Sequence, residues 1–404
     1  MRPFKTLIIL LVNLIALLFF VFFVAQPSEK PIATKEEYDE YFYRDFAWSI
    51  NNFPTNSSTY NGAQYAWGWS NVGNSLVNMY KATGDPKYLE YFAQQAEYIF
   101  TQTDEKLGIE SFSGTGLSLP GWSDGGYYTS GKFNYIYPVH TGMIILPILR
   151  FVDTVKSNEL SEYDKIANQF LKSSGDALAI HNQDTMWKDF SDTEGFYLGH
   201  QHGEGVVSEA GKIGVPNRIS IYIAAAGLYD KLTKGSIYTE RIEKSLNYFK
   251  YSLFKFDKDF NTYYWSYYEE QNIEKPWEDI SHARITIYGI YILHEEAGFS
   301  VFNKQDLDRL ANIVFKVVDE KSSPPLVRKY IHKRDEENKA YYSMDENPYY
   351  SSILRWSFLG IYNEEILEVL KTLSSEMKND EKATNLRLRL NSIASYLYTK
   401  EKLN

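Results

Sequence analysis

The chain contains no cysteine, and this absence excludes every function that needs a thiol. None of its 404 residues offers a thiol that could form a disulfide, bind zinc or act as a nucleophile. Basic residues are also in the minority, because 42 Lys and Arg stand against 52 Asp and Glu, and the net charge is −10. Nucleic acid requires a basic patch, so the charge argues against that partner. A polyanionic substrate would need a locally basic cleft.

Several common functional motifs are missing as well. The sequence has no glycine-rich phosphate loop, no Gly-x-Ser-x-Gly elbow and no dinucleotide-binding fingerprint. ATP-dependent, acyl-transfer and hydride-transfer chemistry are therefore disfavoured, and we expect no nucleotide partner and no cofactor. No tract rich in Pro, Gly or Ser divides the chain, so residues 29–404 are expected to form a single catalytic domain.

The long apolar run of this chain lies at its N-terminus. Residues 6–25 are interrupted only by Asn13, and about 20 apolar residues are enough to span a bilayer. Arg2 and Lys5 precede the run and should keep the N-terminus in the cytoplasm. The end of the run lacks the upstream small residue of a cleavage site. We expect residues 1–28 to be an uncleaved signal anchor, with the catalytic domain outside the cytoplasm. Cleavage would make the protein secreted.

Aromatic residues are unusually abundant, at 16% of the chain with 34 Tyr. Aromatic rings stack on the C–H faces of sugar rings, so this composition suits a glycan-binding protein. A low-GC genome would also raise the Tyr content everywhere, and the composition does not separate the two interpretations.

The rest of the sequence alternates two kinds of helix. Residues 86–100 predict an amphipathic helix whose apolar residues Leu89, Phe92, Ala96 and Ile99 form one stripe. A second stripe of this kind runs along residues 242–253. The other kind is apolar on nearly every side, as expected of a buried helix. It comprises residues 139–152, 219–232 and 280–297, with weaker examples at 67–82 and 350–361. Strand signals are confined to short pieces around 261–268.

The connections between these helices are of two lengths. Those that follow an apolar helix are short, as at residues 82–85. Those that lead back into an apolar helix are long and rich in Trp, Tyr, Gly, His and acids, as at 109–137 and 181–216. This asymmetry is typical of an all-α fold, an (α/α)n toroid of six or seven helical hairpins, in which inner helices are ringed by outer ones. Function is expected on the side of the long loops.

Four short motifs resemble those of bacterial α/α-toroid carbohydrate-active proteins. They are Ala-Trp-Gly-Trp-Ser at 66–70, Tyr-Lys-Ala-Thr-Gly-Asp-Pro-Lys-Tyr-Leu at 80–89, Tyr-Pro-Val-His-Thr-Gly-Met at 137–143 and Glu-Asp-Ile-Ser-His-Ala at 278–283. The resemblance covers most of residues 60–360. This six-hairpin-like superfamily includes polysaccharide lyases, glycoside hydrolases and the helical domain of glucuronyl C5-epimerases. The resemblance implies the toroid fold and a polysaccharide or oligosaccharide substrate, and it leaves the reaction open.

Two histidines are candidates for proton transfer. His140 and His282 each lie in the first turn of an inner helix, and in a toroid these turns converge on one cleft. Histidine is the side chain best suited to proton transfer near neutral pH. Glu278 and Asp279, just before the second of these helices, are further candidates. The alternative is that each histidine caps its helix or bonds a loop carbonyl.

Arg284 and Tyr288 lie four residues apart and therefore share a helix face. Arginine could hold the carboxylate of a uronic acid through two parallel hydrogen bonds, and Tyr288 could relay a proton one turn deeper. The alternative is that a buried Tyr288 makes a hydrogen bond from helix to helix and that Arg284 forms an ion pair with Glu278 or Asp279.

Six further residues are candidates for substrate binding. Asn217 and Arg218 follow Pro216 at the start of an inner helix and could donate hydrogen bonds, although Asn is also an ordinary helix cap. Aromatic side chains in or beside the long loops could support sugar rings, and these are Trp67, Trp122, Tyr137 and Trp277.

His200, His202 and Glu204 come closest to a metal-binding pattern. Alternate residues of an extended segment face one side, so the three could converge. No fourth ligand follows nearby, and the flanking glycines favour a loop. We therefore expect no metal.

Together these features predict an extracytoplasmic enzyme, anchored in the membrane, that cleaves a uronic-acid polysaccharide by β-elimination. Three alternatives stay open: a glycoside hydrolase with a pair of carboxylates, an epimerase resembling the glucuronyl C5-epimerases, and a non-catalytic, membrane-tethered glycan-binding protein.

Overall fold

The structure is a computed structural model that describes residues 33–45, 61–125, 133–203, 207, 210–267, 277–332, 341–343, 346–377 and 386–404. Ala33–Asn404 forms one compact unit. The expected signal anchor, residues 1–28, lies outside the described residues.

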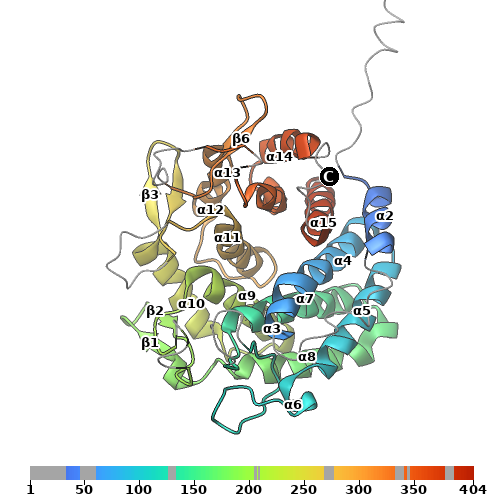
Figure 1. The fold of residues 1–404 in the computed structure, drawn as a ribbon, viewed down its shortest axis with the longest axis vertical. Helices are drawn as coiled ribbons and strands as arrows, with labels where there is room; N and C mark the ends of the chain where they lie inside the picture. The colour runs from blue at the N-terminus through green and yellow to red at the C-terminus, as the bar shows by residue number, and fades with distance from the viewer. Residues whose placement is uncertain are drawn as a thin grey trace, which may run out of the picture. The chain divides into compact units, whose positions relative to one another are not determined.

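A ring of six inner helices organises this unit (Figure 1). Its members in chain order are α4 (Ser70–Thr83), α7 (Pro138–Ser157), α9 (Pro216–Thr233), α11 (Ile280–Glu295), the 3-10 helix η6 (Tyr350–Ile361) and α15 (Leu386–Leu403). Each packs against the next, and α15 packs back on α4, which closes the ring. The expected toroid is therefore present in the described part of the chain.

Neighbouring inner helices run parallel, because their contacts join residues at similar depths. A Cβ on Gly142 of α7 would lie 2.6 Å from the backbone nitrogen of Tyr222 in α9, so only glycine permits this approach. Ser220 of α9 donates a hydrogen bond of 3.3 Å to the carbonyl of Ile285 in α11. All four residues lie within the first two turns of their helices. The N-terminal ends of these helices therefore share one side of the ring.

Outer helices cover the ring on its outside. Their partners are α5 (Lys87–Thr101) on α4, α8 (Asp164–Ala179) on α7, α10 (Thr239–Asn247) on α9 and α14 (Glu365–Met377) on η6. Helices α12 (Lys304–Ala311) and α13 (Ile313–Val317) lie outside α11 in Figure 1. The first described helix, α2 (Lys35–Asp45), packs on the last, α15, where Arg389 and Glu37 form an ion pair of 2.7 Å. The two ends of the unit thus meet at the ring closure.

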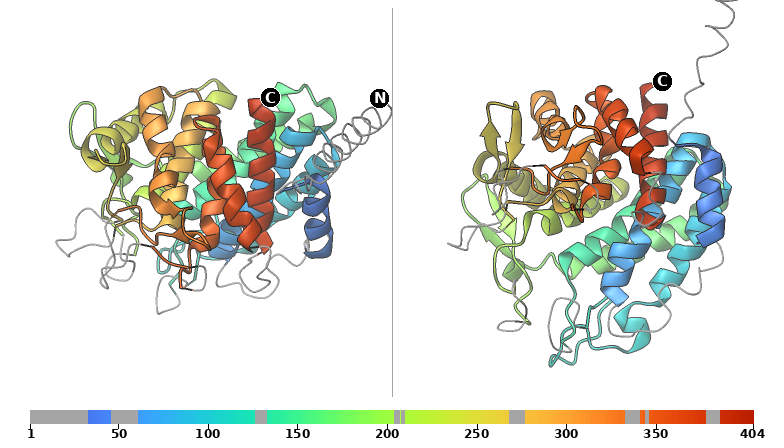
Figure 2. Two further views of the ribbon diagram at one scale, coloured as in Figure 1. Left: turned by 90° about the horizontal axis from the view of Figure 1, so that it is seen from above. Right: turned by 45° about the horizontal axis from the view of Figure 1, so that its top comes forward.

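Short elements fill the connections. Three two-stranded antiparallel ribbons pair β1 (Trp187–Asp189) with β2 (Gly195–Tyr197), β3 (Lys255–Asp257) with β4 (Thr262–Tyr264), and β5 (Val318–Asp319) with β6 (Leu326–Val327). The remaining helical pieces are α3 (Asn61–Gln64), η2 (Tyr65–Trp69), α6 (Asp104–Leu107), η3 (Ser161–Tyr163), η4 (Asp184–Met186) and η5 (Tyr248–Leu253). Figure 2 shows the helices side by side with long connections gathered at one end.

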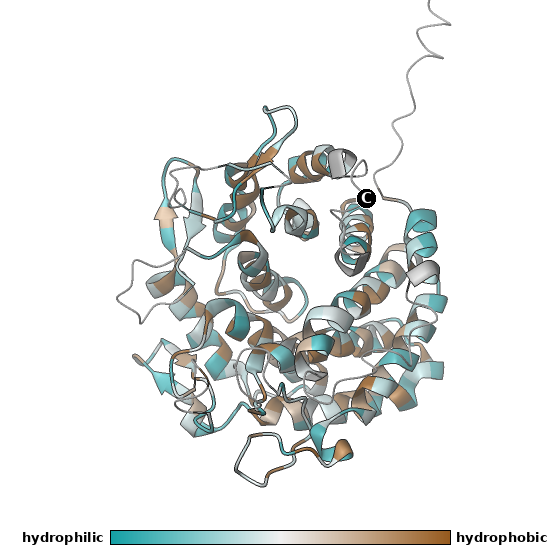
Figure 3. Ribbon diagram, in the orientation of Figure 1, coloured by the Kyte–Doolittle hydropathy of each residue, from teal (hydrophilic) through white to brown (hydrophobic). Residues whose placement is uncertain are grey.

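The core lies between the inner and outer layers, as the hydrophobic patterning predicts. The predicted stripe of α5, formed by Leu89, Phe92, Ala96 and Ile99, is buried against the ring. Figure 3 shows hydrophobic residues along the inner helices and along one side of the outer ones. Among the described helices, α7 is long and apolar enough to cross a membrane, but 94% of that stretch is buried inside the fold, as in a core helix.

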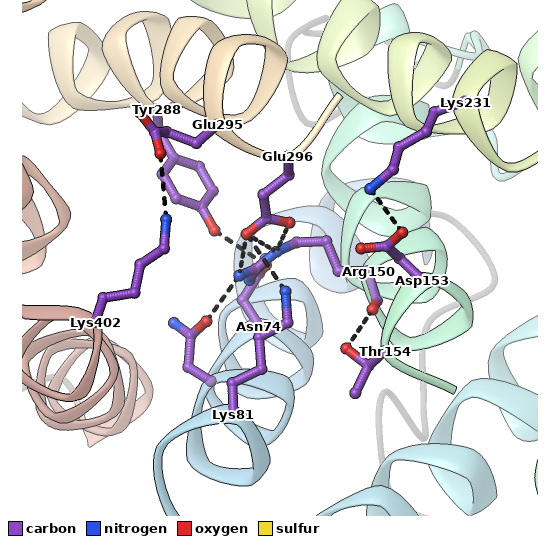
Figure 4. A network of polar contacts seen from close by, with 11 residues as sticks. Asn74, Lys81, Arg150, Asp153, Thr154, Lys231, Tyr288, Glu295, Glu296 and Lys402 are labelled. Atoms are coloured by element: carbon purple, nitrogen blue, oxygen red, sulfur yellow. Dashed lines mark hydrogen bonds and ion pairs between the residues drawn. The ribbon is translucent and has the colours of Figure 1, made fainter. Parts of the chain in front are cut away.

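A charged network ties the inner helices together at the end away from their N-termini (Figure 4). Arg150 of α7 is 1% exposed and donates two hydrogen bonds, of 2.8 and 2.9 Å, to the carboxylate of Glu296 at the end of α11. The same guanidinium donates to Asn74 and Asn78 of α4, at 3.0 and 2.9 Å. Lys81 lies 3.5 Å from Glu296. Three inner helices are therefore joined through one buried arginine.

The charge on Glu296 is essential to this network. Burial alone would raise the pKa of the Glu296 carboxyl, but the charges of Arg150 and Lys81 hold it well below its ordinary value. The carboxylate therefore stays ionised and compensates Arg150.

Replacing Glu296 by Gln is expected to lower the free energy of unfolding by about 3–5 kcal/mol, because the change leaves Arg150 charged and unpaired inside the ring. Chemical denaturation of the full-length protein measures this change. The matched control is Asp176→Asn, which breaks the exposed ion pair of 2.7 Å between Lys172 and Asp176 and should change stability little. A loss in the Glu296 variant no greater than that of the control would contradict the role given to the network.

Candidate active site

The first turn of α11 holds a histidine that an aspartate positions. Asp279 is the N-cap residue, and one of its carboxylate oxygens accepts hydrogen bonds from the backbone N–H groups of Ser281 and His282, at 2.9 and 3.1 Å. The other oxygen lies 2.5 Å from Nδ1 of His282. A carboxylate at Nδ1 favours the tautomer with its proton there, which leaves the lone pair on Nε2. His282 is partly exposed, so Nε2 can serve as a base.

Glu278, the neighbour of Asp279, has a different role. Its side chain is fully buried and accepts hydrogen bonds from Nε1 of Trp265 and from the hydroxyl of Thr286, the latter at 3.1 Å. Burial, and then the charge of Asp279, raise the pKa of Glu278 well above its ordinary value. These hydrogen bonds hold the connection before α11 against the helix. Glu278, a predicted catalytic residue, therefore lies inside the fold.

Arg284 and Tyr288 lie against each other inside the ring, as their spacing predicts. The centre of the Arg284 guanidinium is 4.7 Å from the centroid of the Tyr288 ring, and the two side chains are almost wholly buried. The Tyr288 hydroxyl donates a hydrogen bond of 3.4 Å to Asn74, and burial raises the pKa of Tyr288. Burial lowers the pKa of Arg284 to about 10, so it is still charged at neutral pH. The alternative ion pair with Glu278 or Asp279 is not formed.

Arg355 on η6 is a buried charge near this site that the sequence patterns do not reveal. The residue is 6% exposed, and the charge of Arg284 acts on it directly. An arginine in the apolar segment 350–361 is the signal that could have found it.

His140 lies at the start of α7, between aromatic rings. It is fully buried, and its imidazole contacts the rings of Tyr137 and Trp67 edge to face, with centroids 5.1 and 6.1 Å away. Burial, and then the charges of Arg218 and His181, lower the pKa of His140 well below 6.5. The ring is therefore neutral and a weak base, which argues against His140 as the proton acceptor.

The candidate substrate-binding residues fall in different surroundings. Trp67 and Arg218 are half-buried near the start of α7, and the Arg218 guanidinium lies 5.8 Å from the Tyr137 ring centroid. Tyr137 itself is buried. Asn217 is 1% exposed, and neither polar atom of its side chain has a hydrogen-bond partner among the described residues. A buried amide of this kind needs a partner, so it is a candidate ligand contact.

The other two tryptophans differ from each other. Trp277 is half-buried and packs against Tyr264 and His332, with ring centroids 5.3 and 4.8 Å away. Trp122, which we expected to support a sugar ring, instead lies in the core. It is fully buried and its indole N–H donates a hydrogen bond of 3.1 Å to the carbonyl of Ile99 on α5. Its apolar surface packs on helices, because the connection that carries it folds inward.

Of the three residues that come closest to a metal-binding pattern, the structure describes His200 and His202. The rings of His200 and His202 stack with centroids 4.5 Å apart, and Nδ1 of His200 accepts a hydrogen bond from the backbone of His202. Glu204 lies outside the described residues. Within those residues no group of three His, Asp or Glu side chains is placed to hold a metal ion.

Comparisons with known proteins give similarity of fold. No family model and no curated protein matches the sequence. Among solved structures, the chain is similar to a sugar epimerase from a ruminal bacterium, with 11% identity, a TM-score of 0.45 and coverage of 76% of this chain and 74% of the other. An α-1,6-mannanase from Salegentibacter, whose variant was solved with α-1,6-mannotetrose, has 14% identity and a TM-score of 0.49 over 91% of this chain and 99% of the other. A polysaccharide lyase has 12% identity and a TM-score of 0.49 over 91% and 97%.

These three neighbours are of the kinds that the sequence motifs resemble: an epimerase, a glycoside hydrolase and a lyase. All three identities are below 15% and all three TM-scores are below 0.5.

A second buried histidine gives the fold a dependence on pH. His181 is fully buried, with Nε2 2.9 Å from the hydroxyl of Thr141. Burial, and then the charge of His200, lower the pKa of His181 to about 3. Between pH 6.5 and 3 the unfolded chain therefore binds a proton at this residue that the folded chain does not bind.

The free energy of unfolding is expected to fall as the pH drops below 6.5, and His181 should contribute about 1.4 kcal/mol per pH unit. Denaturant titrations at pH 7, 6 and 5 measure this slope, which should be smaller in the variant His181→Gln. Asn182→Ala, which removes no titrating group, should keep the slope of the unmodified protein. Equal slopes in all three proteins would show that His181 is protonated in the folded state.

Proposed function

We propose that the protein is a polysaccharide lyase that cleaves a uronic-acid-containing polymer by β-elimination. The observation that carries this proposal is the His282–Asp279 pair at the start of an inner helix, followed along the same helix by a buried, charged arginine. β-Elimination needs a base for the C5 proton, a cation for the C6 carboxylate and an acid for the leaving oxygen.

The residues can be assigned to these roles as follows. Nε2 of His282 takes the proton from C5, and Asp279 stabilises the imidazolium that forms. Arg284, with Asn217, neutralises the carboxylate. The C5–H electron pair becomes the C4=C5 double bond, and the C4–O bond breaks. Tyr288, whose raised pKa keeps its hydroxyl protonated, gives a proton to the departing oxygen. No metal or cofactor enters the proposed reaction.

The acids that begin α11 favour a lyase over a hydrolase. A glycoside hydrolase uses two carboxyl groups on either side of the bond that it cleaves. Here Glu278 is held inside the fold by Trp265 and Thr286, and Asp279 is engaged by His282. The residues of α11 therefore offer a histidine base rather than a pair of carboxylates.

The place of action is part of the proposal. The apolar run in residues 1–28 would anchor the enzyme in the membrane with its toroid outside the cytoplasm, where polysaccharides are accessible.

Incubation of the full-length protein with a panel of uronic-acid and neutral polysaccharides tests the reaction. A lyase produces ultraviolet absorbance from the unsaturated uronide together with new reducing ends. His282→Gln should reduce turnover by about 10²–10⁴-fold, because general-base catalysis is lost. Asp279→Asn keeps a helix-capping residue but weakens the hold on His282, so a smaller loss is expected.

The control is His294→Gln, at the far end of α11, where the imidazole lies 3.2 Å from the Phe299 carbonyl. This variant should keep normal turnover. New reducing ends without absorbance would identify a hydrolase. Exchange of the C5 hydrogen with solvent without cleavage would identify an epimerase, and binding without any turnover a glycan-binding protein. Each of these three results contradicts the proposed lyase.

A further inference from the structure

Two buried arginines inside the ring lack a carboxylate partner in the described part of the chain. Arg284 is 4% exposed and Arg355 is 6% exposed, and Nε of each is buried with no hydrogen-bond partner among the described residues. Arg150 is also buried, but its guanidinium donates hydrogen bonds to the carboxylate of Glu296 and to two asparagines. A buried guanidinium carries five N–H donors and a charge, and leaving both unsatisfied is costly.

The two arginines lie on neighbouring inner helices, α11 and η6. The charge of Arg284 adds to burial in lowering the pKa of Arg355 well below its ordinary value. No described carboxylate is among the groups that act on either side chain. An anion bound by both guanidinium groups would remove the cost of leaving their buried charges uncompensated.

Two further buried polar side chains without a described partner lie in the first turns of inner helices. Ser352 is three residues before Arg355 on η6, and its buried hydroxyl has no described partner. The side-chain amide of Asn217, in the first turn of α9, is also buried without a described hydrogen-bond partner. Hydroxyl, amide and guanidinium groups are the donors that bind carboxylate, sulfate and phosphate oxygens. The donors available here therefore suit an oxyanion.

We propose that Arg284 and Arg355 form an oxyanion-binding site within the ring, and that its ligand is the carboxylate or sulfate group of an acidic sugar. The sugar part of this inference rests on the proposed function, whereas binding of an anion does not. Arg355 is thereby assigned as a residue that determines specificity for acidic over neutral sugars. The site also provides the local positive charge that a chain of net charge −10 needs in order to accept an anionic substrate.

Binding can be measured without any turnover, by calorimetry and thermal melting of the full-length protein at constant ionic strength. The probes are glucuronate, galacturonate, glucose 6-sulfate, inorganic sulfate, inorganic phosphate and neutral glucose. At least one acidic sugar should bind and raise the melting temperature, and glucose should not. Arg355→Met should weaken this binding by about 10- to 100-fold, the value of one or two hydrogen bonds to a charged group.

Two controls separate this inference from the proposed function. His282→Gln should lose turnover but keep binding of the acidic sugar, because the histidine is not part of the anion site. Arg241→Gln changes an arginine on the outer helix α10, whose partners are Asn182 and Asp184, and should also keep binding. Loss of turnover in His282→Gln with binding unchanged in Arg355→Met would support the lyase and overturn the anion site.

The stability of the ligand-free protein gives an independent test. Because Arg355→Met removes an unpaired buried charge, the melting temperature of the ligand-free variant should rise rather than fall. A fall would mean that the folded chain itself compensates Arg355, which overturns the proposal. Binding of inorganic sulfate or phosphate without binding of any acidic sugar would overturn the sugar part and identify a site for a free anion.

Discussion

Arginine side chains buried inside the ring of inner helices carry charge that must be compensated. At one end Arg150 is compensated by Glu296, so the charge ties α4, α7 and α11 together. Nearer the N-terminal ends, Arg284 and Arg355 are buried without such compensation. A buried arginine therefore stabilises the fold where a carboxylate compensates it, and favours binding of an anion where no described carboxylate does. Tyr288, whose hydroxyl bonds Asn74, connects the network to the proposed site.

The parallel arrangement of the inner helices explains why the site residues meet. His140, Asn217 and His282 each lie in the first turn of a different helix, and closure of the ring brings those turns to one side. Glycines at positions 142 and 289 allow the backbones of these helices to approach closely. The site is thus built on rigid elements, while the long connections supply aromatic side chains such as Trp67 and Trp277.

The sequence predicts the helices well because their signals are local. The apolar stripe of α5 and the all-apolar pattern of α7, α9 and α11 depend only on spacing along the chain, and their burial is confirmed. The spacing of Arg284 and Tyr288 likewise predicts their contact. Helix α15, which completes the ring, was not foreseen, because charged residues interrupt its apolar pattern. Its inner position comes from packing on η6 and α4.

Relations between helices could not be predicted in the same way. Whether Trp122 faces a substrate or the core depends on how its connection folds, and the sequence pattern is the same in both cases. Glu278 and Asp279 are adjacent acids with different partners. Glu278 is buried and accepts hydrogen bonds from Trp265 and Thr286, whereas Asp279 contacts the imidazole of His282. Arg284 and Arg355 are 71 positions apart in the sequence and lie on the neighbouring helices α11 and η6.

The decisive measurement is the structure of His282→Gln with a bound acidic oligosaccharide. We expect an acidic group of the sugar to be bonded to both Arg284 and Arg355, with the C5 hydrogen of the same sugar residue directed at position 282. An oligosaccharide bound with its acidic groups in solvent, or away from the inner ring, would contradict this expectation.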